Sequence, residues 1–221
     1  MSGKGDPENH GTITRHRVQK TYRRQKAEDI VRTMSFLLTL CLIFLSCKEH
    51  APEVAPTPSV EAKYVLPYPV GTAHTCAQGF NTSYSHYGSF RYAVDFEMPI
   101  GTVVTAARKG RVVYVVESYS DSDQAGGHEN VVIVMHEDST YARYVHLTTN
   151  GGLVEVGQLL MPGDTVGLSG NSGSSYLPHL HFDVTGSFTG AGDQTIPFDF
   201  WNTNPHPFGF QQGAVYEALP Y

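Results

Sequence analysis

The chain is short of the residues that define several protein classes. It has three cysteines and one tryptophan in 221 residues, and only 16% of its residues are charged. Three cysteines are too few for the disulfide framework of a small secreted domain. No uninterrupted apolar run approaches the roughly 20 residues that a membrane-spanning helix needs. From residue 63 onward the sequence also lacks a sustained helical period, so a helical bundle is excluded as well.

The N-terminal part has the features of an export signal rather than of a folded domain. Residues 1–33 are polar and mildly basic, and we expect them to be disordered or to form an upstream extension. Residues 34–47, "MSFLLTLCLIFLSC", have the length and apolar character of a signal-peptide core. Their end, Leu-Ser-Cys, resembles a bacterial lipobox, which implies acylation of Cys47; a plain signal peptide or a single anchor helix is the alternative. Residues 48–62 are rich in proline and charge and predict an extended tether.

Charge changes sign after this leader. Residues 1–47 carry eight Lys/Arg against four Asp/Glu, whereas residues 48–221 carry seven against seventeen, a net charge of −10. An acidic exported part argues against a nucleic-acid partner. We therefore expect one folded domain, residues 63–221, held in the cell envelope and attached to a bacterial membrane through a lipid at Cys47.

The domain itself is predicted to be all-β. Short β-branched and aromatic runs are separated by Gly, Pro, Asn and Asp. Turn residues at 109–110, 138–139 and 162–163 suggest hairpins between neighbouring strands, hence mostly antiparallel sheet. A long loop, 120–129, could overhang a site. The expected strands lie within 90–98, 101–107, 110–119, 130–138, 140–147, 164–170 and 179–186.

The strongest chemical signal is "HLHFDV", where two histidines stand two positions apart in an expected strand. Alternation places His179 and His181 on one face, and Leu180 and Phe182 on the other. Two imidazoles side by side are explained most simply by a shared divalent metal, and zinc accepts His nitrogen and Asp oxygen. The isolated histidines of the domain are expected to be structural or solvated, namely His74, His128, His136 and His206.

Longer segments carry a family resemblance. "YAVDFEMPIGTVVTAARKGRVV", "YARYVHL" and "GLSGNSGSSYLPHLHFDV" resemble the lysostaphin/LytM-type zinc metallopeptidases, the murein endopeptidases, over most of residues 78–184. The resemblance implies an all-β domain similar to the duplicated hybrid motif fold, with zinc as cofactor and peptidoglycan peptide as substrate. It implies that Asp95 and His181 bind the metal, while His146 and His179 are catalytic.

One position departs from this pattern. Where the family usually has its first histidine ligand, four residues before Asp95, this chain has Arg91, and a guanidinium has no lone pair to offer a metal. His86 stands nine residues before Asp95, and the neighbouring Gly88 would allow its loop to fold back. We therefore expect His86 as the third ligand, with an incomplete, inactive site as the alternative.

Three functions remain open from the sequence. The leading interpretation is a zinc-dependent endopeptidase that hydrolyses peptide cross-links of peptidoglycan. A second is a catalytically inactive domain of the same fold that binds wall peptide or activates a partner hydrolase. A third, a carbohydrate-binding β-sandwich, predicts that no metal binds. Aromatic residues ahead of Asp95 either line a substrate groove or pack in the core: Phe80, Tyr84, Tyr87 and Tyr92.

Overall fold

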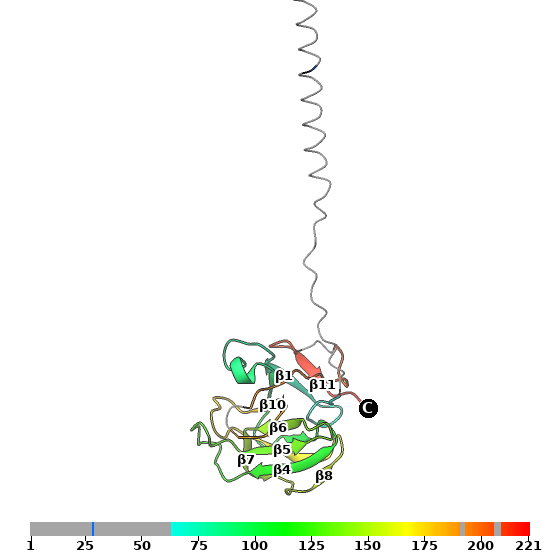
Figure 1. Cartoon of the computed structure of the whole chain (residues 1–221). Helices are drawn as coiled ribbons and strands as arrows, with labels where there is room; N and C mark the ends of the chain where they lie inside the picture. The colour runs from blue at the N-terminus through cyan, green and yellow to red at the C-terminus, as the bar shows by residue number, and fades with distance from the viewer. Residues whose placement is uncertain (1–27, 29–62, 191–192, 206–208) are drawn as a thin grey trace, which may run out of the picture. The chain divides into compact units, whose positions relative to one another are not determined.

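The computed structural model describes Glu28 and residues 63–190, 193–205 and 209–221 of the chain. The predictions of a signal peptide at 34–47, acylated Cys47 and a tether at 48–62, and the assignment of His206, lie outside these residues. In the described part, eleven strands and one short 3-10 helix confirm the all-β prediction (Figure 1). No helix among the described residues has the length and apolar character needed to cross a membrane.

Eight strands form one antiparallel sheet. Their order is β11-β1-β2-β10-β6-β5-β4-β8, so β10 lies at the centre although it is near the end of the chain. The bounds are β1 (Ala73–Gln78), β2 (Ala93–Glu97), β4 (Gly110–Val116), β5 (Val131–Met135), β6 (Tyr141–Val145), β8 (Leu159–Leu160), β10 (His179–Thr185) and β11 (Val215–Glu217).

A second sheet has three strands in the order β3-β9-β7, with β3 (Val103–Thr105), β9 (Thr165–Ser169) and β7 (Leu147–Gly152). Of the three predicted hairpin turns, only the one at 138–139 joins paired neighbours, β5 and β6. The predictions at 109–110 and 162–163 are wrong, because the chain changes sheet at both turns. Such tight turns end a strand without fixing its partner, which non-local packing selects.

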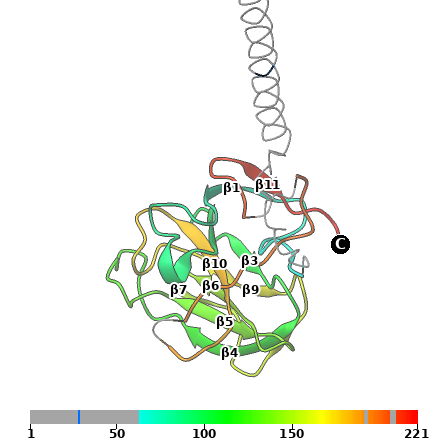
Figure 2. The same cartoon turned by 45° about the horizontal axis from the view of Figure 1, so that its top comes forward.

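The two sheets, drawn as ribbons in Figure 2, share one core according to the packing of their buried side chains. Val104 and Val166 of the smaller sheet belong to the same buried cluster as Phe96 and Phe182 of the larger sheet. Along β10, Leu180 and Phe182 are fully buried in this cluster, whereas His179 and His181 at the alternate positions are only partly buried. The strand alternation expected from the sequence therefore holds, and it presents the histidines on the opposite face.

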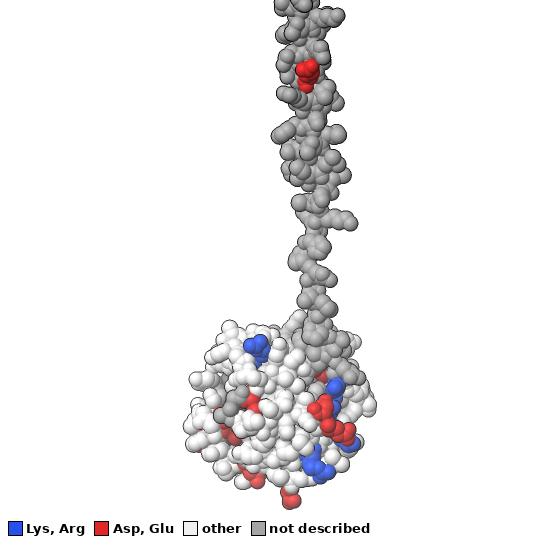
Figure 3. Space-filling model, in the orientation of Figure 1, with Lys and Arg blue, Asp and Glu red and all other residues white. Residues whose placement is uncertain are grey.

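Loops cover that opposite face. The 3-10 helix Gly88–Phe90 lies in the segment between β1 and β2, and Gly88 has a φ of 57°, a conformation that glycine adopts without steric cost. In the view of Figure 3, acidic and basic side chains are interspersed among large uncharged areas. The described surface in that view offers no broad patch of one charge sign.

Candidate metal centre

The centre of the site is a cross-strand pair. Asp95 on β2 lies directly opposite His181 on β10. The His181 Nδ1 is 2.9 Å from the Asp95 Oδ1, and Asp95 is only 3% exposed. Because both residues sit in the middle of the large sheet, the backbone of two paired strands fixes their separation.

His86 completes the cluster from the β1–β2 loop. Its side chain is fully buried, and its Nε2 lies 3.1 Å from the same Asp95 oxygen. His86, Asp95 and His181 each present one donor atom, and these atoms lie within 4.8 Å of one another. The structure thus brings together the three residues expected as ligands; their binding of a metal stays a prediction.

Hydrogen bonding shows that this cluster fits a cation. The Nδ1–H of His86 donates to the Gly79 carbonyl oxygen at 3.0 Å, which leaves a lone pair on Nε2 in the neutral ring. That buried Nε2 makes no hydrogen bond, although it faces a carboxylate oxygen. Two lone pairs at this distance repel each other unless a proton or a metal ion lies between them. Imidazole and carboxylate donors of this kind suit zinc.

A second carboxylate lies behind His181. The Asp183 Oδ2 is 2.9 Å from the His181 Nε2, and Arg143 donates to both Asp183 oxygens, from Nε and from an Nη, at 2.6 Å each. Burial disfavours protonated His181, but its bonds to Asp183 and Asp95 prevail and raise its pKa to about 9 in the metal-free protein. Burial also disfavours ionised Asp95, yet the contacts with His181 and His86 hold its pKa well below the usual value.

The two expected catalytic histidines flank the cluster. His146 and His179 have ring centroids 4.7 Å apart, and the His179 Nε2 is 3.8 Å from the Asp95 Oδ1. Each donates its Nδ1–H to a backbone carbonyl oxygen at 2.7 Å, His146 to Ser172 and His179 to Leu177. Both therefore keep a lone pair on Nε2 in the neutral form.

Burial keeps these two rings neutral. It lowers the pKa of His146 to about 3, with the neighbouring His179 and His181 adding to the effect. It also lowers the pKa of His179, against the opposing influence of Asp95. At neutral pH both rings are therefore in the neutral form, with an unprotonated Nε2.

Arg91 lies apart from this arrangement and outside β2, although the expected strand 90–98 included it. It has helical backbone angles at the end of the 3-10 helix, before β2 begins. Its exposed side chain donates from Nε to the Gly88 carbonyl oxygen at 3.2 Å. The polar neighbour of Asp95 on this side is instead Gln78, whose Nε2 donates to the Asp95 Oδ2 at 2.7 Å.

Sequence reasoning missed the supporting residues Gln78, Arg143 and Asp183. Asp183 had an available signal, because it follows His181 by two positions and strand alternation places both on one face. Arg143 could be found only after pairing β6 with β10, where Arg143 stands opposite Asp183.

The remaining described histidines have partners of their own. His74 bonds the Glu97 carbonyl, His128 pairs with Asp123 and His136 bonds the Lys109 carbonyl. None of the three belongs to the metal-type cluster found among the described residues. They occupy structural or surface positions, as the isolated histidines were expected to do.

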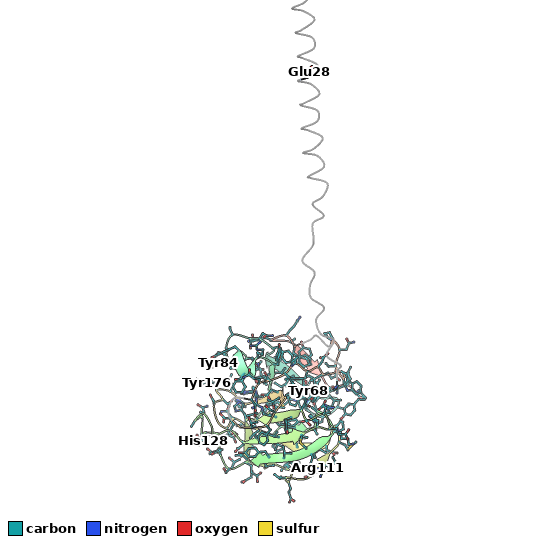
Figure 4. The ribbon with its side chains drawn as sticks, in the orientation of Figure 1. Glu28, Tyr68, Tyr84, Arg111, His128 and Tyr176 are labelled. Atoms are coloured by element: carbon teal, nitrogen blue, oxygen red, sulfur yellow. The ribbon has the colours of Figure 1, made fainter. Side chains whose placement is uncertain are left out.

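The aromatic residues before Asp95 divide into two groups. Phe80 packs against Tyr92 and Phe198 at the core, with ring centroids 5.5 and 5.1 Å away. Tyr84 is 68% exposed and contacts the 76% exposed Tyr176, which comes from the turn before β10 (Figure 4). This exposed pair stands near the histidines in sequence and is available to a ligand.

A largely buried His-Asp-His donor set, flanked by two neutral histidines on an antiparallel sheet, is the arrangement expected of a metal-dependent hydrolase. Residues 89–192 match peptidase family M23, which is the family that this part of the chain resembles. The matched range includes Asp95, His146, His179 and His181. His86 lies just before it.

Two relatives illustrate the likeness. The chain is 35% identical to the peptidoglycan DD-endopeptidase ShyA of Vibrio cholerae over 121 residues, which are 53% of this chain and 26% of that protein. It is 36% identical to lysostaphin of Staphylococcus staphylolyticus over 114 residues, 50% of this chain and 22% of that protein. The chain thus covers about a quarter of the length of these relatives.

Among solved structures, the catalytic domain of lysostaphin from Staphylococcus simulans is 29% identical, with a TM-score of 0.39, over 62% of this chain and 88% of that one. A zinc-containing peptidase from Vibrio cholerae is 31% identical, with a TM-score of 0.42, over 56% of this chain and 37% of that one.

Proposed function

We propose that the domain is a zinc-dependent endopeptidase that hydrolyses peptide cross-links of peptidoglycan. The observation that carries the proposal is the convergence of five side chains: His86, Asp95 and His181 as a buried donor set, with His146 and His179 beside it. A domain that only bound wall peptide would need neither the donor set nor the two neutral imidazoles.

In this proposal His86 Nε2, an Asp95 oxygen and His181 Nδ1 hold the metal. Two neutral imidazoles and one carboxylate leave a divalent ion with a net positive charge. Zinc bound there supplies Lewis acidity, which lowers the pKa of a water molecule and polarises a scissile carbonyl group.

His146 and His179 handle the protons. Each Nδ1–H is occupied by a backbone carbonyl, so the free Nε2 of each ring is the atom that can take the proton of the attacking water. The ring that has taken this proton on Nε2 can then pass it to the leaving amine. Their carbonyl anchors also fix the ring orientation, which reduces the reorganisation needed during the reaction.

The names of the relatives support a peptidoglycan substrate and point to different bonds. ShyA is a peptidoglycan DD-endopeptidase, whereas another relative, 32% identical over 58% of this chain, is the glycyl-glycine endopeptidase ALE-1 of Staphylococcus capitis. The assay should therefore offer both a directly cross-linked and a glycine-bridged peptidoglycan, and detect newly released amines.

The test combines metal analysis with hydrolysis. Purified protein should contain about one zinc per chain, lose hydrolysis when a chelator removes it, and regain hydrolysis when zinc is returned. His146→Ala should keep the zinc and lose hydrolysis. Wild-type protein that binds zinc and cuts neither substrate would favour the inactive, wall-binding alternative, and metal-free protein that still cuts would end the proposal.

We further propose that the protein is exported and attached to the membrane by acylation of Cys47. The apolar run 34–47 and its Ser-Cys end support this attachment. Cys47→Ala should move the protein from the membrane fraction to the soluble fraction, provided that the leader is still cleaved. Unchanged membrane partition of a cleaved Cys47→Ala protein would refute lipid attachment.

A further inference from the structure

A buried carboxylate that is neither a proposed metal ligand nor a proposed proton carrier lies next to the site. Asp183 is completely buried, yet it carries a charge among the strands β6, β10 and β2. On β6, Arg143 is its direct cross-strand partner, and on β10, His181 precedes it by two positions on the same face. All three side chains therefore meet on one side of the large sheet.

The contacts give Asp183 two different partners. Arg143 binds both carboxylate oxygens through two parallel hydrogen bonds of 2.6 Å, the fork arrangement that fixes a carboxylate in one plane. The Oδ2 also lies 2.9 Å from the Nε2 of His181. Arg143 also makes a cation–π contact, because its guanidinium carbon lies over the Phe90 ring, 5.6 Å from the ring centre.

We propose that Asp183 is a positioning residue for the metal ligand His181, and that Arg143 holds Asp183 in place. Both nitrogens of His181 face a carboxylate at 2.9 Å, Nε2 facing Asp183 and Nδ1 facing Asp95. Asp95 is a proposed ligand of the same metal, so with the metal bound Nδ1 offers its lone pair to the ion, and the ring proton stays on Nε2, where Asp183 accepts it. Carboxylate partners of this kind orient a ligating imidazole and increase its basicity.

Arg143 has a separate role in this relay. A buried carboxylate needs a compensating partner, and the forked pair with the guanidinium supplies one. The fork also fixes the plane of the carboxylate, so that Oδ2 stays directed at the His181 Nε2.

The inference rests on metal binding in the proposed function but not on hydrolysis, so it is tested by metal affinity. Zinc dissociation constants are measured on the full chain by competition with a chromophoric chelator. Asp183→Asn should bind zinc roughly 10–100-fold more weakly, the range found for other second-layer partners of ligating histidines. A wild-type protein that binds zinc without cutting peptidoglycan would defeat the proposed function and leave this inference intact.

Asp138→Asn is the matched control, because Asp138 also pairs with an arginine, Arg108 at 2.9 Å, but belongs to no metal-type cluster among the described residues. It should lower the thermal midpoint but leave zinc affinity within about threefold of wild type. The proposal is overturned if Asp183→Asn also stays within that range. It is equally overturned if both variants weaken zinc in proportion to their loss of thermal stability, because Asp183 would then only support the fold.

A measurement on wild-type protein covers the case in which Asp183→Asn does not fold. Long-range proton–nitrogen spectra of the zinc-loaded chain should place the remaining ring proton of His181 on Nε2. A proton on Nδ1 of His181 would contradict the proposed orientation.

Discussion

Replacement of His86 by alanine gives the most direct test of the ligand set. His86 supplies one of three donor atoms and lies on a loop, whereas Asp95 and His181 are held by paired strands. The variant would leave a site with two donors. Its zinc affinity should therefore fall by more than the ~100-fold that loss of a mere orienting partner costs.

The same change has a predictable effect on the metal-free fold. The His86 side chain is fully buried, and its Nδ1–H satisfies the Gly79 carbonyl at 3.0 Å. Alanine leaves this buried acceptor without its donor, at a cost of roughly 1–3 kcal/mol in the free energy of unfolding. The loss is small enough for many domains to remain folded, which circular dichroism can verify before zinc is measured.

Arg91→Ala is the control for this experiment. The Arg91 side chain is exposed and its Nε–H donates to the nearby Gly88 carbonyl, so its removal should change stability by no more than about 0.5 kcal/mol. Since a guanidinium has no lone pair, Arg91→Ala should retain all of its zinc.

The assay is zinc per chain after dialysis against a weak chelator, measured beside wild type. Full zinc occupancy in folded His86→Ala, or loss of zinc in Arg91→Ala, would refute the assignment of His86 as the third ligand. Either result would favour the alternative interpretation, an incomplete and inactive site.

Three further outcomes are expected. Because His181 has a pKa of about 9 in the metal-free protein, zinc must displace its proton on binding. Zinc affinity should therefore rise about tenfold per pH unit from pH 7 and level off above pH 9. Calorimetric titration in buffers of different ionisation enthalpy should detect about one released proton. A pH-independent affinity would contradict this. His179→Ala should keep zinc and lose hydrolysis, as His146→Ala should; loss of zinc from either would make it a ligand instead. Tyr84→Ala should raise KM and spare kcat and zinc content, because the exposed Tyr84–Tyr176 pair can contact substrate only outside the metal cluster; an unchanged KM would make the pair a surface feature.

The strands that sequence predicted share a strong local pattern. β10 and β5 consist mainly of β-branched and apolar residues in alternation or in a short buried run, and both were found. β1, "AHTCAQ", and β7, "LTTNGG", were not, because neither has such a pattern. These two form because a neighbouring strand offers unpaired backbone groups, a property of the sheet rather than of the segment.

The same distinction separates the site residues whose positions the sequence predicted from those whose positions it did not. The alternation in β10 correctly placed His179 and His181 together and opposite the core residues Leu180 and Phe182. The approach of His86 depends on a loop that reverses direction near Gly88, and sequence could offer it only as a candidate. The place of Arg91 outside β2 could not be foreseen, because a run of strand-like residues does not reveal where the first strand residue falls.

The direction of the His146 side chain could not be predicted from strand alternation. If β6 continued regularly, residue 146 would share the face of Ala142 and Tyr144, which are fully buried in the core. Instead the strand ends at Val145, and His146 adopts a φ of 64°, an uncommon value outside glycine.

That break turns the ring away from the core and towards His179, where the Ser172 carbonyl accepts its Nδ1–H. The proposed metal ligands Asp95 and His181 depend on paired strands, but the rings of His146 and His179 depend on backbone carbonyls of the turn that precedes β10. Because different parts of the fold hold the two groups, substitutions in that turn should change hydrolysis while metal binding persists.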